Sequence, residues 1–170
     1  MRGFGLGHLL FLCALGGCLA LGWQAGSTRW RLSALQSSRS SGLKYGTLQH
    51  CGVLVSDVAR SMEFYLNVFD FVDESHLRPT SLPYPGAFLN IAGNFQIHLM
   101  QLPSMDPKEG RPEHGGRDRH IAVTVNNIDI IKERLATRGL PFTMSQSGRR
   151  ALFCRDPDGN AYEFMEMADL

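Results

Sequence analysis

The sequence has only four cysteines in 170 residues and no C-x-x-C pair, which is too few for a disulfide framework. Cys51 and Cys154 are therefore expected to be small buried hydrophobes. Acidic residues are absent from residues 1–46, which hold five of the 17 basic residues. The remaining 124 residues carry 12 bases and 16 acids, a net charge of −4. A mildly acidic domain lacks the basic stripe of a duplex-DNA binder, so we expect no nucleic-acid partner.

An unbroken apolar run long enough to span a membrane is also missing. Residues 3–26 contain no formally charged residue, but the almost wholly apolar part, Leu9–Leu21, is short for a span of about 20 residues and fits a signal-peptide core. Residues 27–41 are rich in Ser and Arg and free of acids, which is typical of transit peptides.

Three interpretations of this leader stay open: a cleaved secretory signal, a membrane anchor, or organelle targeting. We favour organelle targeting, with a chloroplast or other plastid as the destination. Residues 1–46 are therefore taken as a leader outside the fold. A membrane partner is expected only if that leader is retained.

An internal repeat organises residues 47–170. The segment 50–57 (HCGVLVSD) aligns with 120–127 (HIAVTVNN) at a constant offset of 70. Each segment begins with His, alternates for six residues as a strand does, and ends in a residue that caps helices. The apolar residues that follow recur at the spacing of one helix face, which predicts a helix in each half. These residues are Val58, Met62, Leu66 and Phe69 in the first half and Ile128, Ile131 and Leu135 in the second.

Each predicted helix is followed by strand-like sequence and then by a hairpin with a Gly-containing turn. The strands are expected at 71–77, 86–91 and 95–101 in the first half and at 141–147, 151–155 and 161–165 in the second. Each half therefore reads β-α-β-β-β. We expect an α+β fold in which modules 47–102 and 118–167, joined by the loop 103–117, form a curled, cup-like mixed sheet with the helices outside.

Strand alternation decides which polar side chains share a sheet face. His50 and His120 occupy equivalent positions of the repeat, and His98 corresponds to Glu163 at an offset of 65. At each position the opposite strand face is bulky and apolar, while the face of the polar residue is small enough to line a cavity. Three imidazoles and one carboxylate suit a divalent ion such as Zn, Ni, Co, Fe or Mn. The sequence therefore predicts one metal site on these four residues, with Glu163 as the candidate catalytic base.

Other polar residues carry weaker signals. Arg119 and Arg149 are candidate substrate-binding residues, because arginine can hold a carboxylate or phosphate. His76 is expected at the surface, and His114, in a Gly-rich loop, is expected to be exposed. The loop that contains His114 is long enough to act as a lid or a dimer contact.

The strand histidines, the doubled module and the ending D-P-D-G-x-x-x-E resemble the glyoxalase I / bleomycin-resistance / extradiol-dioxygenase (vicinal oxygen chelate) superfamily. The stretches LPYPGAFLNIAGNFQIHLMQLP, GRPEHGGRDRH and DPDGNAYEF are similar, more narrowly, to glyoxalase-like proteins of cyanobacteria and plant plastids. The resemblance covers nearly all of residues 47–167. It implies a metal-dependent lyase or isomerase, similar to lactoylglutathione lyase, that acts on a small oxygen-chelating substrate such as a thiol adduct. A homodimer is one arrangement that it allows.

By position, His50, His120 and Glu163 match metal ligands of that family, whereas His98 stands where glyoxalase I has Glu. Leu54 replaces an Arg that holds glutathione in family glyoxalases, and Leu102 replaces an Asn. The resemblance therefore implies the fold and the metal, but a glutathione substrate does not follow from it. The alternatives within the superfamily are a thiol transferase, an extradiol-type dioxygenase and a non-catalytic protein that binds a small molecule.

Overall fold

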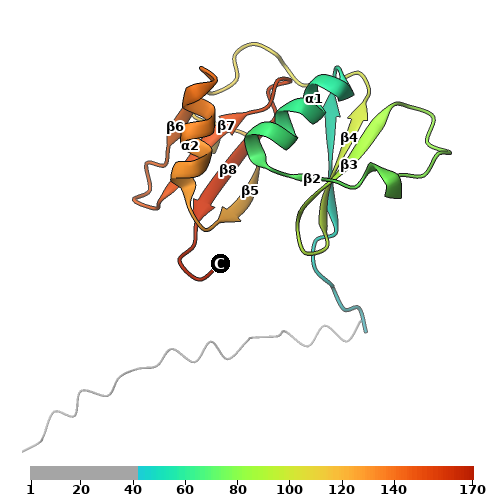
Figure 1. The fold of residues 1–170 in the computed structure, drawn as a ribbon, viewed down its shortest axis with the longest axis horizontal. Coiled ribbons are helices and arrows are strands. Elements are labelled where there is room, and N and C mark those ends of the chain that lie inside the picture. The colour runs from blue at the N-terminus through green and yellow to red at the C-terminus, as the bar shows by residue number, and fades with distance from the viewer. Residues whose placement is uncertain (1–41) are drawn as a thin grey trace, which may run out of the picture. The chain divides into compact units, whose positions relative to one another are not determined.

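Two four-stranded mixed sheets carry the fold of residues 45–170 in the computed structural model, which describes residues 42–170 (Figure 1). The predicted apolar and Ser/Arg-rich segments of the leader lie outside the described residues, so organelle targeting stays a prediction. Within residues 42–170, no helix is long and apolar enough to cross a membrane.

The order of elements confirms the doubled β-α-β-β-β module. The first module consists of β1 His50–Val55, α1 Val58–Phe64, the π-helical turn η1 Tyr65–Phe69, β2 Val72–Asp73, the 3-10 turn η2 Ser75–Leu77, β3 Gly86–Ala92 and β4 Phe95–Gln101. The linker contains the 3-10 turn η3 Gly115–Arg117. The second module consists of β5 His120–Val125, α2 Ile128–Thr137, β6 Phe142–Met144, β7 Ala151–Arg155 and β8 Ala161–Glu166.

Strand order is the same in both sheets. The first sheet runs β1-β4-β3-β2 and the second runs β5-β8-β7-β6. In each, the first strand pairs in parallel with the last strand of its module, and the remaining pairs are antiparallel. The strands β1 and β5 therefore lie at a sheet edge, and each begins with one of the predicted histidine ligands.

Both helices begin where the sequence predicts, because a side-chain oxygen caps each one. The Asp57 carboxylate accepts a hydrogen bond from the Arg60 amide at 3.1 Å, and the Asn127 side chain accepts one from the Asp129 amide at 2.9 Å. The strand predicted over 71–77 is reduced to two residues. There the Asp73 carboxylate accepts a hydrogen bond from the Ser75 amide, a local turn that competes with strand pairing.

The apolar faces of both sheets meet in one hydrophobic core, and α1 lies between the strands of the two modules (Figure 1). The π-helical turn that extends α1 reaches the second sheet, where the rings of Phe69 and Phe164 approach to 4.8 Å between centroids. The helices thus cover the apolar faces, as the strand alternation predicts. The faces that carry the predicted ligands point away from this core, and His50 and His120 are exposed.

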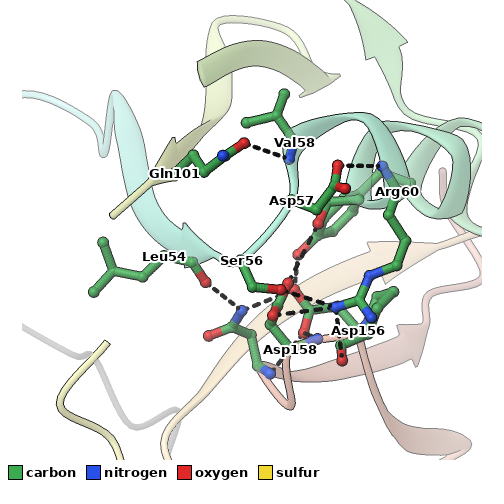
Figure 2. Close-up of polar contacts among 12 residues, drawn as sticks. Leu54, Ser56, Asp57, Val58, Arg60, Gln101, Asp156 and Asp158 are labelled. Atoms are coloured by element: carbon green, nitrogen blue, oxygen red, sulfur yellow. Dashed lines mark hydrogen bonds and ion pairs between the residues drawn. The ribbon is translucent and has the colours of Figure 1, made fainter. Parts of the chain in front are cut away.

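A polar network links the turn before β8 to the end of β1 (Figure 2). The buried Asp156 carboxylate accepts hydrogen bonds from the amides of Asp158 and Asn160 at 2.9 and 2.7 Å. It also accepts bonds from the Asn160 side chain at 2.8 Å and from the Tyr65 hydroxyl at 2.7 Å. The Asn160 side chain donates in addition to the Leu54 carbonyl at 3.1 Å. The network therefore fixes the strand that carries Glu163 relative to the strand that carries His50.

Candidate metal centre

The first half of the candidate site is a pair of stacked imidazoles. The rings of His50 and His98 lie 4.1 Å apart between centroids, with 10° between their planes. His98 lies opposite Gly52 of β1 in the parallel register, which brings it within reach of His50 two residues earlier. On its other side, His98 stacks on the Phe88 ring at 3.6 Å. The strand alternation predicted for these histidines is therefore present, and both face the same side of the first sheet.

The second half pairs an imidazole with a carboxylate. His120 Nε2 lies 3.2 Å from Glu163 Oε2. Glu163 lies opposite Ala122, two residues after His120, so this register repeats that of the first half. The offsets of 70 and 65 in the sequence therefore correspond to equivalent places in two equivalent sheets.

Hydrogen bonds at the outer ring nitrogens leave imidazole lone pairs available for a cation. His120 Nδ1 donates to the Asp118 carbonyl at 2.8 Å, which leaves the lone pair on Nε2, next to the carboxylate. His98 Nε2 lies 3.0 Å from the Gln96 amide oxygen, and the Gln96 amide nitrogen donates to the Glu74 carboxylate. Because Glu74 fixes the orientation of that amide, His98 Nε2 carries a proton and Nδ1 is the free atom.

Electrostatics favour the neutral form of His98. Burial lowers the pKa of its imidazole, and the nearby charge of His50 lowers this pKa further. A neutral imidazole is the form that binds a metal ion.

Glu163 is the most buried of the four candidates, with 5% of its surface exposed. Its Oε1 is buried and has no hydrogen-bond partner among the described residues. The nearest cation is Arg149, whose Nη2 lies 3.7 Å from Oε1, too far for a hydrogen bond. Within the described chain Oε1 thus lacks a hydrogen bond, while Oε2 faces the lone pair of His120 Nε2 at 3.2 Å. Both arrangements are unfavourable unless a cation binds there, so the donor set fits a divalent ion.

The two predicted substrate arginines lie in different surroundings. Arg149 lies beside Glu163, and its role in substrate binding stays a prediction. Arg119 forms an ion pair with Asp106 of the linker, and its side chain is 74% exposed. Its neighbour Asp118 is more constrained. Burial alone would raise the pKa of Asp118, but hydrogen bonds from Arg111 and Arg155 lower it to about 2.

The structure brings the four predicted ligands together as two pairs. Within residues 42–170 of one chain, no three His, Cys, Asp or Glu side chains are close enough to hold a metal ion. The predicted set of four ligands on one ion therefore stays a prediction. Each pair, one on each sheet, is a half-site of this predicted metal centre.

Three residues next to these half-sites were not predicted from the sequence: Phe88, Phe153 and His114. Phe88 lies opposite His98 in the first sheet, and Phe153 lies opposite Glu163 in the second. The two aromatic residues are 65 positions apart, as His98 and Glu163 are. The expectation that His114 is exposed is wrong. It is half-buried, with Nδ1 2.7 Å from Thr143 Oγ1 and its ring 4.8 Å from that of Phe153.

Two glycines explain how the linker reaches this position. A Cβ atom at Gly115 would lie 3.0 Å from Phe153 Cβ, and one at Gly116 would lie 3.0 Å from Phe153 Cζ. The linker backbone therefore lies directly on the Phe153 ring. The centroid of this ring lies 5.4 Å from that of the His120 ring. Periodicity could not reveal this contact, because it joins a loop to a strand more than thirty residues away.

Comparison with known proteins connects this geometry to a family. The family model of the Glyoxalase/Bleomycin resistance protein/Dioxygenase superfamily matches residues 47–164. The curated protein Glyoxylase I 4 of Arabidopsis thaliana is 29% identical over 118 residues, which span 66% of this chain and 66%, just under two thirds, of the plant protein.

Solved structures share the fold. A mutant of the fosfomycin resistance protein FosX from Listeria monocytogenes, complexed with Mn(II) and 1S,2S-dihydroxypropylphosphonic acid, is 21% identical, with a TM-score of 0.58 over 72% of this chain and 93% of that one. Lactoylglutathione lyase from Agrobacterium tumefaciens is 20% identical, with a TM-score of 0.50 over 73% of this chain and 96% of that one. At these identities the likeness concerns the fold, and the predicted α+β class is confirmed.

Proposed function

Because the chain belongs to the Glyoxalase/Bleomycin resistance protein/Dioxygenase superfamily, we propose that it is a metal-dependent lyase or isomerase of glyoxalase type, with a site completed by a second copy of the chain. The observation that carries the proposal is the presence of two pairs at equivalent places of the repeat, His50 with His98 and His120 with Glu163, on the sheet faces opposite those that α1 and α2 cover. Neither pair can hold an ion with more than two protein ligands.

Sheet topology supports completion by a second copy. His50 begins β1 and His120 begins β5, and each of these strands is the edge of its sheet. Unpaired edge strands favour association with another strand. If β1 of one copy lies alongside β5 of another, the two half-sites meet and form the N₃O ligand set. A two-fold dimer would repeat this junction, so each dimer would have two sites.

Glu163 is the proposed base. Its carboxylate lies in a buried setting, and its Oε1 makes no hydrogen bond within the described part of the chain. That oxygen is therefore available to remove a proton from a carbon next to a substrate carbonyl and to return it at the neighbouring carbon. A bound divalent ion supplies Lewis-acid stabilisation of the negative charge that develops on the carbonyl oxygen. Arg149, beside Glu163, is placed to orient an anionic part of the substrate.

The substrate we propose is a small molecule with two neighbouring oxygens, because a divalent ion held by His50, His98, His120 and Glu163 would still have room for two further oxygen ligands. A glutathione adduct is not required. Leu54 stands where the resemblance places an Arg that holds glutathione, and Leu102 stands where it places an Asn. Both line a cavity of about 440 Å³, whose charged lining residues Asp106, Lys108, Arg111 and Asp158 belong to other positions. Other thiol adducts therefore belong in the substrate panel, together with catechols and epoxides that would identify dioxygenase or thiol-transferase activity.

The decisive experiment mixes two inactive variants. His98→Ala damages one half-site and His120→Ala the other, so each homodimer lacks a complete site. In a mixed dimer both substitutions belong to the same site. The other site takes its four ligands from the unchanged halves of the two chains and is intact. Random reassortment makes about half of the dimers mixed, so we expect about a quarter of wild-type bound metal and turnover. No recovery of metal in verified mixed dimers would contradict the shared site, and no turnover by metal-loaded wild type across the panel would contradict the lyase or isomerase activity.

We also propose that residues 1–46 direct the domain to a plastid. The support is the Ser- and Arg-rich, acid-free composition of residues 27–41. Fusion of residues 1–46 to a fluorescent protein tests this in plant cells. Fluorescence in the secretory pathway would favour the alternative interpretations instead.

A further inference from the structure

A cavity of about 410 Å³ opens beside the first half-site. His98 and its stacking partner Phe88 form one wall, and the loop between η2 and β3 forms the other. Apart from His98, its lining is mostly apolar or aromatic, with a single formally charged residue, Arg78. The lining includes Arg78, Leu82, Tyr84, Phe88 and Met100. A cavity of this size and composition suits a small organic ligand that is oriented by one polar contact.

Arg78 is half-buried, and none of the ion pairs found within residues 42–170 includes it. A guanidinium group has five N–H donors, and the hydrogen bond found for Arg78 in the described chain goes from Nη2 to the Tyr84 carbonyl. Its Nε is buried without a hydrogen-bond partner among the same residues. A partly desolvated cation with unused donors is unfavourable, and an oxyanion would relieve that cost.

The fold makes room for this guanidinium. A Cβ atom at Gly86 would lie 3.0 Å from Arg78 Nε and 3.4 Å from Nη2. The Arg78 carbon Cζ lies 5.4 Å from the centroid of the Tyr84 ring, which holds the group by a cation–π contact. The arginine is therefore packed in the wall of the cavity instead of extending into solvent.

We propose that this cavity binds the oxyanionic group of a substrate with a short apolar or aromatic body, and that Arg78 is the residue that recognises the charge. The body would lie against Phe88, Leu82 and Met100, with its reacting end toward His98. The inference rests on the proposed function for its relation to catalysis, and it narrows the substrate class to small organic acids or their adducts.

The test uses benzoate and its neutral counterpart benzamide as probes, titrated into the metal-free full-length protein at pH 8. At that pH ordinary histidines are neutral, and without metal the probe has no ion to bind. We expect benzoate to bind, Arg78→Met to weaken its binding at least tenfold, and benzamide binding to change less than twofold. Arg78→Lys should retain part of the benzoate affinity, because it keeps the charge and loses the planar fork. Arg138→Met, which removes an exposed arginine at the end of α2, should leave both probes unaffected.

Two results would overturn the inference. One is undetectable benzoate binding by the wild type, and the other is equal benzoate binding by wild type and Arg78→Met. If Arg78→Met does not fold, Arg78→Gln takes its place, because it keeps a polar side chain and removes the charge. Equal benzoate binding by wild type and Arg78→Gln would then overturn the inference. Recovery of metal in mixed dimers together with failure of benzoate binding would remove the anion cavity and leave the proposed function in place.

Discussion

Replacement of Asp156 by alanine should destabilise the domain strongly, because one buried carboxylate accepts hydrogen bonds from three residues of both modules. Hydrogen bonds to a charged group contribute about 1.5–3 kcal/mol each, and Asp156 accepts four. Part of that stabilisation offsets the burial of the charge, which raises the pKa of Asp156 although bonds from Asn160 and Tyr65 oppose the rise. Asp156→Ala leaves these buried donors without their acceptor, at a cost of about 1–3 kcal/mol for each donor that stays unsatisfied.

Urea unfolding followed by circular dichroism measures this loss. We expect the free energy of unfolding to fall by about 4 kcal/mol and the midpoint of thermal unfolding by roughly 15 °C for a domain of this size. Asp169→Ala, at an exposed position near the C-terminus, is the matched control and should change stability by less than about 0.5 kcal/mol.

A double-mutant cycle locates the effect in the network. Tyr65→Phe removes one donor to Asp156 and the acceptor of the Tyr162 hydroxyl, which lies 3.0 Å away. Because the two residues share a hydrogen bond, their effects should be non-additive by about 1–2 kcal/mol. If Asp156→Ala lowered the free energy of unfolding by less than about 1 kcal/mol, or if its effect were strictly additive with that of Tyr65→Phe, the turn at Asp156 would not stabilise the contact between the modules.

Three further outcomes are expected. Glu163→Gln should lower kcat at least about 100-fold while metal content is retained, because the amide can ligate an ion but cannot take a proton; wild-type kcat in this variant would exclude Glu163 as the base. Asp118→Asn should lower the free energy of unfolding at pH 7, and the difference from wild type should shrink as the pH falls from about 4 to about 2. A depressed carboxylate pKa stabilises the fold above the unfolded-state pKa and ceases to do so as the folded-state pKa is crossed, so a difference independent of pH would contradict this origin. Gly116→Ala should destabilise the linker by about 1 kcal/mol, because its Cβ would lie 3.0 Å from Phe153 Cζ, and unchanged thermal stability would show that the ring can move aside.

The sequence predicted the modules well because their signals are local and repeated. Strand alternation and the capping residues Asp57 and Asn127 depend on neighbours within a few positions, and the structure confirms both. The apolar face predicted for the first helix was less accurate. Phe69 is buried, but Val58, Met62 and Leu66 only flank the core, since the helix continues as a π-helical turn that buries Tyr65 and Val68 instead.

The candidate site was predictable only up to the pairs. Strand alternation puts His50 and His98 on one face of the first sheet, and His120 and Glu163 on one face of the second. The strand register then brings the two members of each pair together. How two sheets are oriented depends on the packing of their helices, which no period in the sequence encodes. The contact of His114 with Phe153 was likewise hidden, because a glycine pair in a loop shows no periodicity that identifies its partner.

In the proposed dimer, the division of the predicted ligands between two sheets would also couple assembly to metal occupancy. Within residues 42–170 one chain brings at most two such ligands together, whereas the proposed dimer would offer four, so the ion and the partner chain would strengthen each other's binding by the same factor. Chelation should then loosen the dimer, and dilution should release the ion from protein whose chains remain folded. Specific activity would consequently depend on protein concentration, and the number of functional centres in a cell would follow the abundance of both components together.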